Sequence, residues 1–181
     1  MSTLVVTIAC VDERVSKRLC CRSRPLDEHR FRDRTIMADS EQDLVNRFTD
    51  VLSSNESPWG RVRFTREFDY QRGRTDIVVL NGDGHLVAVE AKLSRWRDAL
   101  QQAYRNRCFA HTSYVLLPKP VALRAVQYAG DFQMRGVGVC YCDADAVSIL
   151  IEAPLTPPLQ PWLSEVAGVT ITGEAGDCAP A

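Results

Sequence analysis

The strongest constraint on the fold is a pair of apolar segments joined by a turn. Residues 75–80 and 85–92 are rich in Val, Leu and Ala, and the sequence Asn-Gly-Asp-Gly at 81–84 favours a turn between them. Strands that are apolar on both faces need helices to cover both sides of their sheet. The sequence therefore predicts a mixed α/β domain with this hairpin at its centre.

Hydrophobic periodicity predicts the elements on either side of the hairpin. The expected helices cover about 40–53, 95–110 and 121–132, and the expected strands cover 62–68, 75–80, 85–92, 113–117, 136–142 and 146–152. The resulting order is α-β-β-β-α-β-α-β-β, a mixed central sheet flanked by helices. The first two helices are the expected covers of the hairpin.

The two ends of the chain differ from this central part. Residues 1–37 mix Arg clusters with acids without a sustained period, which is typical of a disordered arm or of non-native upstream sequence. Met37 is an alternative start of the protein. The folded domain is expected over 38–153, and 154–181 is expected to be a Pro/Gly-rich tail that frays.

Composition excludes a membrane protein of the helical kind. No apolar run approaches the roughly 20 residues that span a bilayer, and the apolar start of the chain lacks the basic flank of a secretory signal. The seven Cys do not form paired CxxC motifs, so they are interpreted as reduced thiols. These features predict a cytoplasmic protein without a membrane partner.

The net charge of −1 hides an uneven distribution of charge along the chain. Residues 61–124 contain twelve basic and six acidic side chains, whereas the remainder contains ten basic and seventeen acidic ones. A basic central segment favours a polyanionic partner such as nucleic acid. A solvated charged face is the alternative interpretation.

Three charged residues interrupt the apolar strands of the hairpin: Asp76, Glu90 and Lys92. Glu90 and Lys92 are two residues apart, so a regular strand directs them to the same face. Only three of the 22 basic residues are Lys, so a Lys at this position points to a compact, deprotonatable charge. Because buried charges are costly unless paired or bound to metal, the triplet indicates either a catalytic metal site or a structural ion pair.

The turn decides whether the two acids meet. A three-residue loop over 82–84 pairs Asn81 with His85 and places Asp76 opposite Glu90, with Cβ atoms about 5 Å apart. A two- or four-residue loop would instead place Asp76 opposite Val89. Three-residue loops end in a left-handed residue, for which Gly84 is suited, so the sequence predicts the first register.

Asp76, the turn and Glu90-Ala91-Lys92, between one acidic helix and a second helix, resemble the PD-(D/E)xK nuclease superfamily. The resemblance covers about residues 40–118 and implies a restriction-endonuclease-like core, with Asp76 and Glu90 as metal ligands and Lys92 orienting the attacking water. It also matches Glu41 to an accessory helix acid and metal ligand, and Gln102 to a Gln of the following helix. The chain departs from the motif at Thr75, where the family often has Pro.

Elementary chemistry supports the same expectation. Mg²⁺ prefers oxygen ligands and is commonly held by one or two carboxylates, to which the Ala91 carbonyl would add a third ligand. The expected function is a Mg²⁺- or Mn²⁺-dependent nuclease acting on DNA in repair, restriction or mobile-element defence. RNA is an alternative substrate, and a homodimer is an open possibility. The alternative function is a nucleic-acid-binding module of the same fold with little or no catalysis.

Overall fold

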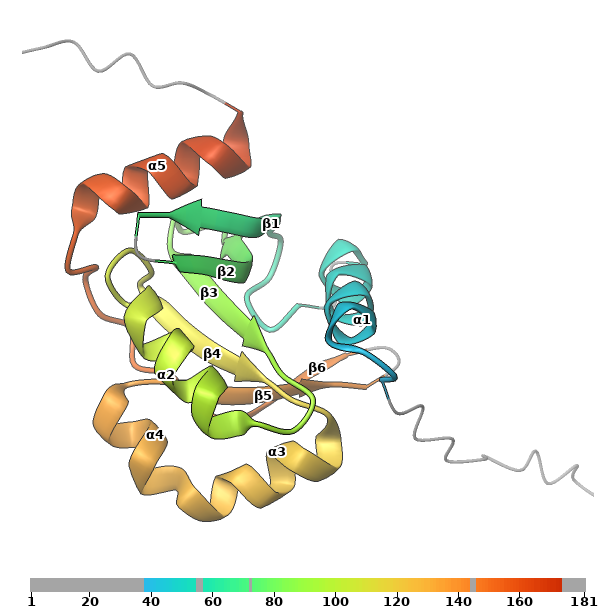
Figure 1. Ribbon diagram of the computed structural model, residues 1–181. Helices are drawn as coiled ribbons and strands as arrows, with labels where there is room; N and C mark the ends of the chain where they lie inside the picture. Colours follow the sequence, from blue (N-terminus) through green and yellow to red (C-terminus); the bar gives the residue numbers. More distant parts are fainter. Residues whose placement is uncertain (1–37, 55–56, 72, 144–145, 174–181) are drawn as a thin grey trace, which may run out of the picture. The chain divides into compact units, whose positions relative to one another are not determined.

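The computed structural model describes residues 38–54, 57–71, 73–143 and 146–173. Within this part, six strands form one sheet in the order β1-β2-β3-β4-β5-β6 (Figure 1). Pairing is antiparallel from β1 to β3, parallel from β3 to β5, and antiparallel again between β5 and β6. The predicted mixed α/β class is confirmed. The strands are β1 (Arg63–Tyr70), β2 (Gly73–Leu80), β3 (Leu86–Ala91), β4 (Thr112–Leu116), β5 (Gly138–Cys142) and β6 (Val147–Ile151).

Helices lie on both faces of the sheet, with α1 on one face and α2 and α3 on the other (Figure 1). Since α2 connects β3 to the parallel strand β4, it forms the crossover that such a pair requires. Among the described residues, none of the helices is long and apolar enough to cross a membrane. The helical elements are α1 (Glu41–Ser53), α2 (Trp96–Asn106), α3 (Lys119–Ala125), the 3₁₀ turn η1 (Val126–Tyr128), α4 (Ala129–Arg135) and α5 (Pro161–Thr172).

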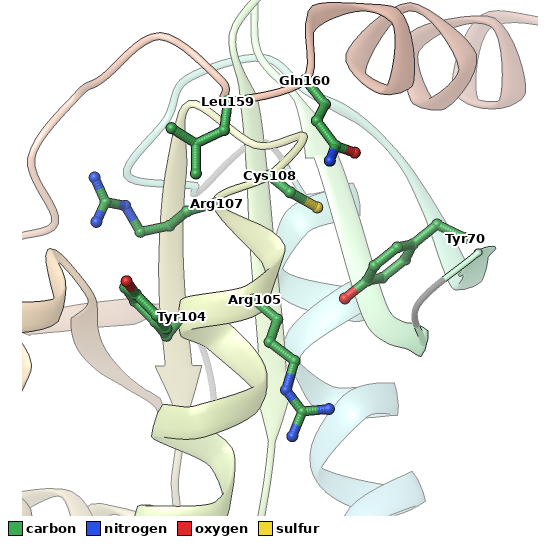
Figure 2. Close-up of a pocket in the computed structure, with 7 residues that line it drawn as sticks. All are labelled: Tyr70, Tyr104, Arg105, Arg107, Cys108, Leu159 and Gln160. Atoms are coloured by element: carbon green, nitrogen blue, oxygen red, sulfur yellow. The ribbon is translucent and has the colours of Figure 1, made fainter.

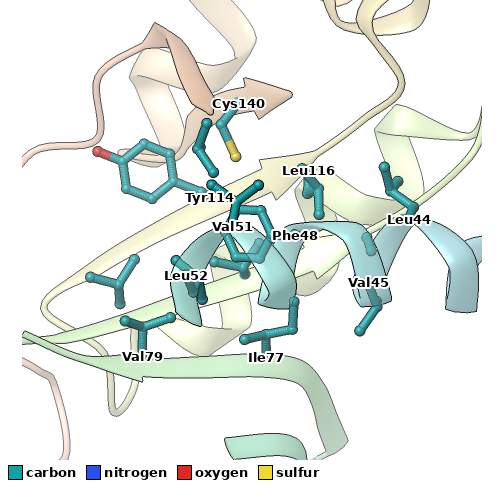
Figure 3. Packing of buried hydrophobic residues seen from close by; sticks show 14 of the residues in the cluster. Leu44, Val45, Phe48, Val51, Leu52, Ile77, Val79, Tyr114, Leu116 and Cys140 are labelled. Carbon is teal, nitrogen blue, oxygen red and sulfur yellow. The ribbon is translucent and has the colours of Figure 1, made fainter. Parts of the chain in front are cut away.

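Helix α1 begins where the sequence provides a cap. The Ser40 side chain accepts a hydrogen bond from the Asp43 N–H, which satisfies one of the unpaired donors at the helix start. Leu44, Phe48 and Leu52 recur at helical spacing and are buried against the sheet. Figure 3 shows these side chains beside Ile77 and Val79 of β2 and Tyr114 and Leu116 of β4. The helix predicted over about 40–53 is thereby confirmed.

The opposite face of the sheet is covered by the apolar stripe of α2. Trp96, Leu100 and Ala103 pack with Val115 and Val139 of the parallel strands. A third apolar cluster joins β1, β2 and β3 to the C-terminal helix α5. Both faces of the central strands are therefore covered, as their double-sided apolar sequence requires.

The hairpin between β2 and β3 has the predicted register. Val79 pairs with Val87, and the Asn81 N–H donates to the His85 carbonyl at 3.1 Å. Gly84 has φ +79°, the left-handed conformation expected at the end of a three-residue loop. The alternative register, with Asp76 opposite Val89, is excluded because Val89 pairs with Ile77.

Two parts of the predicted element order differ from the structure. The single helix expected over 121–132 is divided into α3, η1 and α4. The region expected to be a Pro/Gly-rich tail contains α5, with Pro161 in its first turn, where a missing N–H costs no helical hydrogen bond. Leu163 and Ala167 anchor this helix against the sheet. The predictions for residues 1–37 concern a part of the chain that lies outside the described residues.

Strand β1 changes face in its middle, at Glu67. Glu67 has φ +53°, the only positive value among the described non-glycine residues. Before it, Arg66 reaches α1 and donates hydrogen bonds to Asn46 and Thr49. After it, Phe68 packs into the cluster on the opposite side with α5. In a regular strand these two positions would share a face, so the left-handed backbone at Glu67 reverses the direction of the side chains that follow.

Candidate active site

Asp76 and Glu90 occupy adjacent strands at neighbouring positions. The paired residues Ile77 and Val89 come directly after and before them, so the same register sets Asp76 opposite Glu90. The Asp76 carboxylate accepts a hydrogen bond from the Ala91 N–H at 2.8 Å, which fixes its orientation beside β3. Glu90 is 1% exposed, so its carboxyl group lies inside the protein rather than in solvent.

The Glu90 side chain is held by a polar residue of α2. The Asn106 amide donates to Glu90 Oε1 at 2.6 Å, and the Tyr70 hydroxyl donates to Asn106 Oδ1 at 2.7 Å. Burial, followed by the charge of Asp76, raises the pKa of Glu90 to about 8, although the hydrogen bond from Asn106 opposes the shift. At neutral pH the buried Glu90 carboxyl group is therefore favoured when it holds a proton or binds a cation.

Lys92 follows β3 and contacts the start of α1. Its ammonium group lies 2.8 Å from Glu41 Oε2, with side-chain exposures of 22% for Lys92 and 49% for Glu41. Burial lowers the pKa of Lys92, but the hydrogen bond and charge of Glu41 outweigh it, so the pKa is raised overall. Glu41 thus meets the lysine of the predicted site.

Gln102 lies on α2, one helical turn before Asn106. Its Oε1 atom is buried and accepts no hydrogen bond from the residues that the structure describes. An unsatisfied buried acceptor is costly, and it is a feature that folding alone does not explain. Among the described residues, no hydrogen bond joins the Gln102 side chain to Asp76 or Glu90.

The donor set suits a hard divalent cation at the acid pair. Two carboxyl groups share one face of the hairpin, and burial together with mutual repulsion disfavours leaving both charged without a cation. Carboxylate oxygens are the ligands that Mg²⁺ prefers, and one or two of them commonly suffice. Within the described residues, no three His, Cys, Asp or Glu side chains gather into a metal-binding group. A cation would thus rest chiefly on Asp76 and Glu90, with Ala91 as the expected backbone ligand.

Sequence reasoning missed Asn106 and Tyr70. Asn106 offered a signal, because it is a polar residue at the end of the buried stripe formed by Trp96, Leu100 and Ala103. A polar residue in such a stripe needs a buried partner. The sequence around Tyr70 gives no such signal, because the face to which the Tyr70 side chain points depends on the reversal of β1 at Glu67.

Comparisons with known proteins support the fold. No family profile and no curated protein sequence matches the chain. A solved structure, the SPO1766 protein of unknown function from Silicibacter pomeroyi, matches with a TM-score of 0.53 and 18% identity, over 72% of this chain and 82% of that one. A repair endonuclease from Pyrococcus abyssi aligns at a TM-score of 0.35 and 16% identity, over 62% of this chain and 47% of the other. The first match shows that this α/β arrangement occurs in another protein, and the second is too distant to add to it.

Proposed function

We propose that this protein is a divalent-metal-dependent nuclease of the PD-(D/E)xK type that hydrolyses phosphodiester bonds in DNA. The observation that carries the proposal is the hairpin register, which sets Asp76 opposite the buried Glu90. Two carboxyl groups at opposed positions destabilise a packed core unless a proton or a cation neutralises them, whereas they provide the oxygen ligands of a metal-binding site. The basic segment 61–124, which contains both acids, favours a polyanionic substrate.

Each residue of the site has a role that follows from its surroundings. Asp76 and Glu90 would hold Mg²⁺ or Mn²⁺, with help from the Ala91 carbonyl. The cation would polarise the phosphodiester and lower the pKa of a water molecule. Lys92, whose raised pKa keeps it charged, would hold the attacking water or a phosphate oxygen. Glu41 positions Lys92 through their 2.8 Å contact, and a role in the metal's water shell is a further prediction.

A cleavage assay on purified protein tests the proposal. Asp76→Ala, Glu90→Ala and Lys92→Ala should each lower the rate on DNA by on the order of 10²-fold or more, because each removes a ligand or a positioned water. Glu165→Gln, which alters an exposed acid on α5, is the matched control and should cleave normally. Substrates should include supercoiled, linear, branched and single-stranded DNA with Mg²⁺ or Mn²⁺. Equal residual cleavage in the three variants and the control would refute the assignment.

The alternative is a nucleic-acid-binding module without turnover. A binder gains nothing from acids facing a phosphate backbone, so the presence of Asp76 and Glu90 favours the enzyme. The two functions differ in one measurement: a binder holds DNA with a strong salt dependence and never cleaves it. In that case Asp76→Asn would tighten DNA binding by reducing repulsion of phosphate, and added Mg²⁺ would produce no product.

A further inference from the structure

A pocket of about 450 Å³ lies next to the two hydrogen bonds that link Tyr70 to Asn106 and Asn106 to Glu90. Its lining comes from β1, the C-terminal end of α2 and the segment before α5, as Figure 2 shows. This volume falls in the range of small-molecule and cofactor sites. The lining residues are Tyr70, Tyr104, Arg105, Arg107, Cys108, Leu159 and Gln160.

The walls of the pocket are held by backbone hydrogen bonds. The Gln160 N–H donates to the Cys108 carbonyl at 2.7 Å, and the Leu159 N–H donates to the Arg107 carbonyl at 3.4 Å. The Arg107 side chain is fixed in turn by a 2.9 Å bond to the Arg135 carbonyl. The segment before α5 therefore stays against the end of α2, and the pocket is present before any ligand arrives.

The chemistry of the lining favours a nucleotide. Two Arg and two Tyr line the pocket, and its lining includes no Asp or Glu. Arginine pairs with phosphate oxygens, and tyrosine rings provide faces on which a base can stack. Arg105 and Tyr104 are both exposed, so a ligand can reach them. The lining therefore favours a ligand that is both anionic and aromatic.

The pocket is also linked to the acid pair. The Tyr70 hydroxyl bonds Asn106, and Asn106 bonds Glu90, so two hydrogen bonds connect the pocket wall to the site. An occupant of the pocket would therefore contact Tyr70, which two hydrogen bonds link to Glu90. A base stacked inside a duplex cannot enter such a pocket without leaving its stack.

We infer that this pocket receives an unpaired nucleotide of the DNA strand that is cleaved, which makes single-stranded or frayed DNA the preferred substrate. The inference rests on the proposed function and specifies its substrate class. Tyr104 and Arg105 are the substrate-binding residues, since they contribute an exposed ring and an exposed cation to the lining. Tyr70 positions Asn106 and, through it, Glu90.

The test compares a labelled single-stranded oligonucleotide with its blunt duplex, using wild type, Tyr104→Ala, Arg105→Gln and the control Arg124→Gln, which alters an exposed Arg on α3. Wild type should show a KM for the single strand at least about tenfold below that for the duplex. The two pocket variants should raise this KM by about tenfold, the scale of one lost base stack, while kcat changes less. Arg124→Gln should match wild type.

Equal KM values for both substrates, or pocket variants that behave like Arg124→Gln, would overturn the inference while leaving the nuclease proposal intact. Fluorescence anisotropy of the single strand with Ca²⁺ separates the two proposals. One outcome would support the pocket inference and refute the nuclease proposal. In it, wild type binds the single strand, Arg105→Gln binds it about tenfold more weakly, and neither protein cleaves any DNA with Mg²⁺ or Mn²⁺. If binding is equal in both proteins, the pocket inference fails.

Discussion

The two faces of the β2–β3 hairpin show how one segment serves two purposes. On the face toward α1, Ile77, Val79, Val87 and Val89 belong to one apolar cluster with residues of that helix. Figure 3 shows Ile77 and Val79 in this cluster. The other face begins in the same way but ends at the opposed Asp76 and Glu90. Since both faces belong to the same strands and share one register, the backbone cannot account for the difference.

The difference comes from the helices that meet each face, since α1 covers one face and α2 and α5 cover the other. The stripe of α1 contributes hydrocarbon, with Phe48 fully buried at its centre. The stripe of α2 ends in Asn106, whose amide group partly satisfies Glu90. One face therefore supports the fold and the other carries a cost that only a bound cation or proton relieves. The following predictions separate stability from activity on this basis.

Phe48→Ala should have the largest effect, and that effect should be on stability. Removing a fully buried Phe costs about 3–5 kcal/mol, from lost transfer energy and the cavity that remains. Urea unfolding measures the change, and the rate of cleavage per folded molecule should stay within about twofold. A variant that keeps its stability would show that α1 contributes less to the core than its burial indicates.

Glu90→Gln should have the opposite profile. The Gln amide oxygen can still accept the hydrogen bond from Asn106, and Gln, like the protonated Glu90, carries no charge at neutral pH, so the free energy of unfolding should be maintained. Cleavage should fall by on the order of 10²-fold because a metal ligand is lost. Loss of stability without loss of activity would make Glu90 a structural residue.

Binding of Mg²⁺ should depend on pH through Glu90. Its pKa of about 8 means that the metal-free protein holds a proton there at neutral pH, and the cation must displace it. The apparent affinity should therefore rise about tenfold per pH unit below pH 8 and level off above it. Calorimetry in buffers of different ionisation enthalpy detects the released proton. A flat profile in wild type, matching that of Glu90→Gln, would contradict the role of Glu90.

Glu41→Gln should have the smallest effect of the four. The substitution keeps a hydrogen-bond acceptor for Lys92 but removes the charge that raises its pKa. We expect kcat to fall by less than about tenfold, with the Mg²⁺ dependence nearly unchanged. If activity falls as far as in Glu90→Gln, Glu41 is a metal ligand rather than a partner of the lysine.

What the sequence could predict is what depends on local chemistry. The turn residues Asn81 and Gly84 determine the hairpin register, and the register determines which residues oppose each other. Both strands and the turn are contiguous, so their pairing could be worked out by counting. The start of α1 was equally local, because Ser40 caps it.

What the sequence could not predict depends on distant contacts. Helix α5 has apolar residues all around it, so periodicity gives a weak signal, and its neighbouring Pro residues suggest a loop. It becomes a helix in the fold because Leu163 and Ala167 find a surface on β1 and β2. The partners of Glu90 and Lys92 likewise come from α2 and α1, whose docking no local pattern encodes.

The reversal at Glu67 has a consequence for strand slippage. β1 lies at the edge of the sheet, where a regular strand can shift along its neighbour or recruit another chain. Arg66 is tied to α1 on one side, while Phe68 is buried on the other. In a regular strand, a shift of two residues keeps every side chain on its own face. Here such a shift would expose Phe68 or bury the charge of Arg66. The left-handed conformation at Glu67 thus ties the two halves of this edge strand to different faces of the sheet, which disfavours a shift along β2.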